Sequence, residues 1–156
     1  MNKQQLQQQV CQRLDNDLAL AIRAAQAAHQ AATDEESKAE NKYDTRGLEA
    51  SYLAAGQSRR VEEIRQAAAA WRNLQMRDFD EALGIQLGAL IHLQAVDGRS
   101  QRLLLGPDGA GLKLPDEQGE IMLITPRAPL GQQLLGLAEG DEVGIGKERW
   151  SILQVQ

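Results

Sequence analysis

The stretch CQRLDNDLALAIRAAQAAHQAA, residues 11–32, repeats apolar or small side chains at alternating intervals of three and four residues. The repeating positions are Cys11, Leu14, Leu18, Ala21, Ala25, Ala28 and Ala32. Because an α-helix makes one turn every 3.6 residues, this spacing places them on one stripe of a helix. The pattern is typical of a coiled-coil seam, and its alanines allow a second helix to approach closely.

A second stripe with the same spacing follows, and its members are Ala50, Ala54, Gln57, Val61, Ile64, Ala68 and Trp71. The segment between the stripes has no apolar seam and contains the turn-compatible run Asp44-Thr45-Arg46-Gly47. We therefore predict an antiparallel helical hairpin within one chain, with its tip near residues 40–48. A spacer, or a coil that pairs with a second chain, has the same periodicity and stays open as an alternative.

The composition of the chain changes near residue 84. Residues 1–83 contain two glycines and no proline, whereas residues 84–156 contain the other twelve glycines and all four prolines. Short apolar runs lie between these turn residues, at 89–93, 102–105, 111–114, 121–124, 141–145 and 150–155, and a short helix is predicted after Pro129. We predict an α+β chain: residues 1–82 form a coiled-coil hairpin, and residues 83–156 form a small β-rich domain.

The overall composition bounds the function. A net charge of −5 argues against a protein that binds free duplex DNA, because such proteins carry a basic surface. No apolar run reaches the length of a membrane span, and the N-terminus lacks a signal-peptide core, so we expect a cytoplasmic protein. Cys11 is the single cysteine, and His29 and His92 are isolated, so we expect no disulfide, no metal site and no cofactor of its own.

The aromatic content is low, at 3%. Binding sites for small molecules are usually lined by apolar and aromatic side chains, so a large substrate pocket is not expected.

The run PLGQQLLGLAEGDEV, residues 129–143, resembles the C-terminal domain of the Gre transcript-cleavage factors, GreA and GreB. The pattern of that family reads Ser-Pro-Leu-Gly-Arg-Ala-Leu-Leu-Gly-Lys-x-x-Gly-Asp-Glu-Val. The chain departs from it at Ala128, at Gln132-Gln133 and at Leu137. A second match is the run ASYLAA, residues 50–55, which resembles the family's Ala-Glu-Tyr-His-Ala-Ala.

This resemblance implies a coiled-coil hairpin followed by an FKBP-like C-terminal domain. It also implies that the globular domain docks on RNA polymerase at the mouth of the secondary channel, and that the hairpin enters the channel and contacts the nascent RNA end. In this family, carboxylates at the tip help to hold the second Mg²⁺ and the attacking water in the polymerase's own active centre, which promotes cleavage of backtracked RNA. The factor modulates transcription elongation without an active site of its own.

The tip of this chain departs from the family pattern, which reads Asp-x-x-Glu-Asn-Ala-acid-Tyr. Alignment on the second match puts Thr45, Leu48, Glu49 and Ser51 at the positions of the aspartate, the glutamate, the asparagine and the second acid. Asp44 and Glu49, the candidate catalytic acids, each lie one residue away from an acidic position, which is about 100° of rotation on a helix. A channel competitor or inhibitor that does not stimulate cleavage is therefore the alternative function.

The resemblance also assigns the remaining candidate residues. The surface that docks on the polymerase is predicted to comprise Pro129, Leu130, Gly131, Leu134, Leu135 and Gly136. We expect Leu130 and Leu134 to be partly packed, and a bulky residue at Gly131 to weaken docking.

Arg59 and Arg60 on the second helix are candidates to face the RNA end, because contacts to phosphate need only positive charge; they are equally suited to be flanking residues of a coil. An FKBP-like shape also raises the possibility of a prolyl isomerase. Trp150 is the one aromatic residue in 84–156, which argues against an aromatic-lined isomerase pocket.

Overall fold

A computed structural model describes residues 2–38 and 46–156. The chain is an α+β protein in which two long N-terminal helices precede a six-stranded sheet domain. It folds into two compact units, of which one comprises residues 12–68 and the other residues 1–11 together with 69–156. The division after residue 82 into a hairpin and a globular domain stays a prediction.

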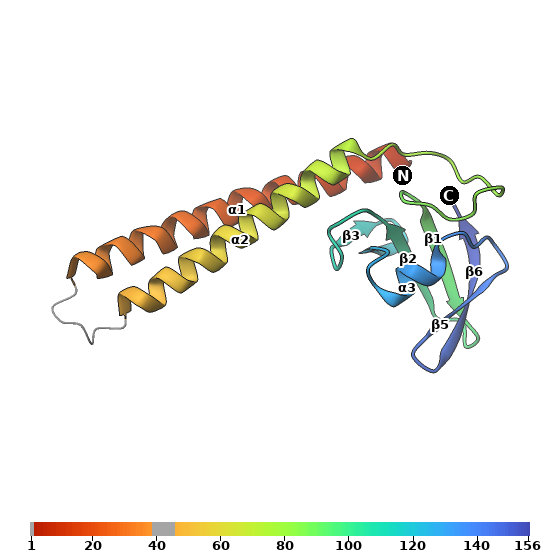
Figure 1. Cartoon of the computed structure of the whole chain (residues 1–156). Helices are drawn as coiled ribbons and strands as arrows, with labels where there is room; N and C mark the ends of the chain where they lie inside the picture. The colour runs from red at the N-terminus through yellow and green to blue at the C-terminus, as the bar shows by residue number, and fades with distance from the viewer. Residues whose placement is uncertain (1, 39–45) are drawn as a thin grey trace. The chain divides into compact units, whose positions relative to one another are not determined.

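Two long helices carry both predicted stripes. Helix α1 spans Lys3–Lys38 and helix α2 spans Arg46–Asn73. Within residues 12–68 they run side by side in opposite directions (Figure 1), and His29 Nε2 lies 3.0 Å from Ser58 Oγ across the pair. The buried side chains here are Leu14, Ala21, Ala25, Ala28, Ala32, Ala54, Ile64, Ala67 and Ala68. These burials confirm that the stripes pack against each other within one chain.

The start of α2 lies earlier than the sequence predicts. Arg46 and Gly47, assigned above to the turn, belong to the first turn of this helix. A glycine is tolerated there because the first backbone N–H groups of a helix have no partner within the helix. Asp44 and Thr45 lie outside the described residues.

The unit of residues 1–11 and 69–156 includes the start of α1 and the end of α2. Gln7 Nε2 donates hydrogen bonds to the carbonyl oxygens of Trp71 and Leu74, at 2.8 and 2.7 Å. These carbonyls lie at and just beyond the end of α2, where the Trp71 oxygen also accepts a long bond of 3.4 Å from Leu74 N, so a side chain of α1 caps the end of its partner helix. Trp71 is fully buried, and its Nε1 donates to the carbonyl oxygen of Asp108 at 2.7 Å.

The sheet contains six strands in the order β3-β4-β2-β1-β6-β5. Their bounds are β1 Leu90–Ala95, β2 Ser100–Leu105, β3 Lys113–Asp116, β4 Gly119–Ile124, β5 Glu142–Ile145 and β6 Glu148–Val155. All neighbours are antiparallel except β2 and β4, which are parallel. Each strand overlaps one of the predicted runs, so the pattern of turn residues located them correctly.

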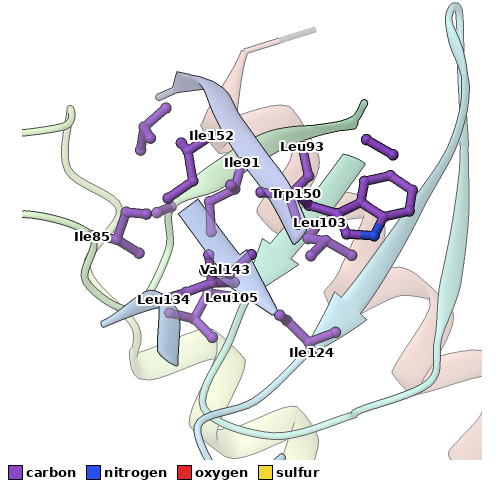
Figure 2. Packing of buried hydrophobic residues seen from close by; sticks show 13 residues of the cluster. Ile85, Ile91, Leu93, Leu103, Leu105, Ile124, Leu134, Val143, Trp150 and Ile152 are labelled. Carbon is purple, nitrogen blue, oxygen red and sulfur yellow. The ribbon is translucent and has the colours of Figure 1, made fainter. Parts of the chain in front are cut away.

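One hydrophobic cluster of this unit lies on one face of the sheet, whereas Leu90, Leu104, Leu114, Ile121 and Leu123 of the strands are buried outside this cluster. Helix α3, Pro129–Leu134, lies over this face and contributes Leu134, while the segment before β1 contributes Ile85 (Figure 2). The strands contribute alternate side chains, as expected when successive residues point to opposite faces. Those labelled in Figure 2 are Ile91, Leu93, Leu103, Leu105, Ile124, Val143, Trp150 and Ile152.

Candidate functional site

The segment that carries the family-like pattern forms a short helix with clear start and stop signals. Pro129 occupies the first turn of α3, where its missing N–H costs nothing and its fixed φ suits the helix. The helix ends before Gly136, whose φ of +81° is accessible mainly to glycine. We call residues 129–136 the α3 segment.

The residues of the α3 segment divide into an inner and an outer set. Gly131 and Leu134 are buried, Leu130 and Leu135 are partly buried, and Pro129 and Gly136 are exposed. Leu134 is fully buried, not partly packed as expected, because it is part of the core under the sheet. A partner can therefore touch the outer set directly, whereas Gly131 and Leu134 can act only by holding the segment in place.

Gly131 lies against the backbone of its own chain, whereas the sequence suggested close approach of a partner protein. A Cβ atom at this position would lie 2.0 Å from the carbonyl oxygen of Thr125 and 2.6 Å from its carbon. The close backbone approach that requires glycine is thus made to the chain itself, inside the domain. Gly131 is buried and faces the turn before α3, and its part in docking stays a prediction.

The α3 segment is also joined to the stretch of chain that precedes β1. Ile85 N donates to the carbonyl oxygen of Leu137 at 2.8 Å, and Gly136 N donates to the carbonyl oxygen of Ile85 at 2.9 Å. Gly84 lies so close to Gly136 that a Cβ atom on Gly84 would be 2.2 Å from the carbonyl oxygen of Gly136. This pair of bonds fixes the C-terminal end of the α3 segment.

A cavity of about 490 Å³ lies beside that same stretch. Its apolar lining includes Leu74, Phe79, Leu83 and Leu87. At its wall, Lys3 Nζ donates to the main-chain oxygens of Arg77 and Gln156. Burial lowers the pKa of Lys3, and the carboxylate of Asp78 partly offsets this effect. Lys3 therefore ties the start of α1 to the chain after α2 and to the end of β6.

The start of α2 presents one candidate acid among apolar side chains. Glu49 lies in the first turn of the helix, where a carboxylate is favoured by the helix dipole, and it is exposed. Leu48, Tyr52 and Leu53 are also exposed, at 55%, 70% and 58%. Asp44, the other candidate acid, lies outside the described residues.

These side chains occupy two different faces of α2. Leu48 and Tyr52 are four residues apart and share a face, and they are turned by roughly 120° and 160° from the buried seam residue Ala54. Glu49 is rotated by about 100° from Leu48 and shares a flank with Leu53. Leu48, which the alignment above puts opposite the glutamate of the Gre pattern, is thus exposed, and Glu49 points in another direction.

The two candidate RNA-facing arginines are exposed but do not form one patch with Glu49. Arg59 and Arg60 lie ten and eleven residues further along α2, which is about 15 Å from Glu49. They are about 100° apart. Arg59 therefore lies on the same face as Tyr52, and Arg60 on the same flank as Glu49, in each case nearer to the C-terminal end of α2.

Within residues 2–38 and 46–156, no three side chains of His, Cys, Asp or Glu come close enough to hold a metal ion. No helix in these described parts combines the length and the apolar character needed to cross a lipid bilayer.

Comparisons with known proteins give structural similarity only. No family model and no curated protein sequence matches the chain. Among solved structures, the GreA factor homolog 1 (Gfh1) of Thermus thermophilus is similar at 18% identity and a TM-score of 0.37, over 94% of both chains. A second structure of the transcription factor Gfh1 has 18% identity and a TM-score of 0.39, over 93% of this chain and 92% of that chain. Gfh1 of Thermus aquaticus has 17% identity and a TM-score of 0.36, over 92% of both.

Proposed function

We propose that this chain is an accessory factor of RNA polymerase, which docks through its sheet domain and inserts its helix pair into the secondary channel to modulate transcript elongation. The observation that carries the proposal is the pair of long helices held together by one narrow, mostly alanine seam. Such a pair is thin, and α1, with 36 residues, is about 54 Å long. Its place before a domain with the Gre-like run 129–143 supports the same function.

The proposal includes the finer points that the resemblance implies. The chain would belong to the Gre family, its sheet domain would be FKBP-like, and it would act in the cytoplasm without catalysing a reaction of its own. The seam residues are already buried within a single chain, which favours this factor over a self-association module.

Docking is assigned to the outer set of the α3 segment. Pro129 and Gly136 are exposed, and Leu130 and Leu135 are half-covered, so together they offer an apolar surface on a short helix. The inner residues, Gly131 and Leu134, hold this surface against the core. The nascent RNA end would meet the other unit, at α2.

A second candidate function is occupation of the channel without stimulation of cleavage. The observation that favours it is the exposed Leu48, where the family pattern has a glutamate. A leucine cannot bind Mg²⁺, which prefers oxygen ligands, and Glu49 points about 100° away. A tip of this kind would fill the channel and exclude a cleavage factor.

Binding and cleavage must be measured separately to test the proposal. Purified protein is titrated against RNA polymerase to obtain the Kd, and it is then added to backtracked elongation complexes in which RNA cleavage is followed. Saturable binding is expected. The absence of binding would overturn the proposed function, whereas binding without cleavage, together with competition against a cleavage factor, would select the second candidate.

If the tip does stimulate cleavage, its carboxylates should carry the effect. The double variant Asp44→Asn, Glu49→Gln is expected to lose cleavage by a factor of about 100, because the Mg²⁺ in the polymerase would lose its extra oxygen ligands. Its Kd for the polymerase should stay unchanged, since docking is assigned to the other unit. Glu63→Gln, which neutralises an exposed acid on α2 away from the tip, serves as the matched control. Full cleavage by the double variant would move the metal-binding role to another group.

A further inference from the structure

One side chain of α3 reaches the edge of the sheet and pairs with its main chain. Gly144 N donates to Gln133 Oε1 at 3.0 Å, and Gln133 Nε2 donates to the carbonyl oxygen of Gly144 at 3.0 Å. These are both of the hydrogen bonds that one residue of a neighbouring strand would exchange with Gly144. We call this pair of bonds the amide clasp.

The clasp lies at an edge of the sheet, because β5 is the last strand in the order. In the register of β5 and β6, Gly144 lies opposite Arg149, and its N–H and C=O are directed to Gln133. Without a partner these groups would be available to pair with a strand from another chain. The opposite edge, β3, contains Pro115, which has no N–H to offer. Both edges thus carry a feature that opposes strand addition.

The clasp also holds the outer side of the α3 segment. This helix has six residues, and the residue at its N-cap makes no hydrogen bond through a side chain. Leu134 and Gly131 anchor its inner side. Gln133 is exposed and is bonded on the side of β5, so it holds the outer side of the segment, which the buried residues do not hold.

We infer that Gln133 is a positioning residue, whose amide clasp fixes the α3 segment in one orientation at the β5 edge and closes that edge. Its effect on docking rests on the proposed function. An alanine at this position, as in the Gre pattern, could make neither bond. Space does not force the arrangement, because a Cβ atom on Gly144 would lie 3.9 Å from Gln133 Oε1, which is ordinary contact.

The clasp is tested first in the free protein, by NMR measurement of hydrogen exchange at the Gly144 amide. Gln133→Ala should speed this exchange by at least about fivefold, the change expected for the loss of one hydrogen bond of about 1 kcal/mol. Gln133→Asn keeps the amide but is one CH₂ shorter, so it should behave like alanine. Gln132→Ala, which shortens the exposed neighbour, should leave the exchange unchanged. Equal exchange in Gln133→Ala and wild type would overturn the clasp.

The positioning role is tested next, by the affinity of the same variants for RNA polymerase. Gln133→Ala should raise the Kd by about fivefold or more, in parallel with the faster exchange at Gly144. An unchanged Kd with faster exchange would overturn positioning, and a raised Kd with normal exchange would make Gln133 a direct contact instead. If the wild type itself does not bind polymerase, the proposed function fails while the exchange result still decides the clasp.

Discussion

Replacing Trp71 with alanine is expected to lower the free energy of unfolding by about 3–5 kcal/mol, the largest effect of any single change considered. The side chain is fully buried, and its indole N–H is bonded to the carbonyl oxygen of Asp108. Gly106 lies so near the ring that a Cβ atom there would be 2.1 Å from Trp71 Cζ2. The alanine variant would therefore leave a cavity beside Gly106, and the carbonyl oxygen of Asp108 would lose its indole donor.

Urea unfolding followed by the fluorescence of Trp150, the other tryptophan, measures this effect in the sheet domain itself. Trp71→Phe keeps most of the buried surface and loses the hydrogen bond, so it should cost only about 1–2 kcal/mol. If the free energy of unfolding fell by less than about 1 kcal/mol in the alanine variant, the packing of Trp71 would not be what holds the end of α2 in this unit.

The second large effect is expected for Gly131→Ala, at roughly 2–4 kcal/mol of lost stability. The added methyl group would overlap the carbonyl group of Thr125, which is backbone and cannot rotate away. Helix α3 would have to shift, and the proposed docking on RNA polymerase would weaken as a consequence. Thermal unfolding gives the loss of stability, and far-UV circular dichroism should stay nearly constant because α1 and α2 provide most of the helix.

Gly56→Ala is the matched control for this change. Gly56 lies in α2, and beyond the adjoining backbone of this helix no atom lies within 4 Å of an added Cβ, so alanine should increase stability by up to about 1 kcal/mol. If Gly131→Ala were as stable as Gly56→Ala, the close approach between α3 and Thr125 would not constrain the domain.

The sequence was sufficient for the elements and insufficient for the contacts between them. The stripes of α1 and α2 follow from helical periodicity, and the start of α3 follows from Pro129, which is a local signal. The burial of Gly131 against Thr125 could not be predicted from the sequence. A glycine that allows close approach of a partner protein cannot be distinguished, in the sequence alone, from one that allows close approach of its own chain.

The contacts of Trp71 and Gln133 were missed for a related reason. Trp71 ends a periodic stripe, so periodicity assigns it to the seam, whereas its indole also bonds a turn 37 residues away. Gln133 was noted only as a departure from a pattern, and its bonds to Gly144 depend on how α3 lies on the sheet. The direction of Glu49 could be anticipated, since one residue on a helix is about 100°.

The buried side of α1 has a graded composition, and this grading affects how the protein unfolds. Near the start of α1 the buried residues are Leu6, Val10 and Leu14, whereas from residue 21 to 32 they are all alanines. An alanine buries three carbons fewer than a leucine, which removes about 2 kcal/mol of burial energy at each position. The alanine end of the pair should therefore open by fraying many times before the sheet domain unfolds, and a protease would first cut the chain there.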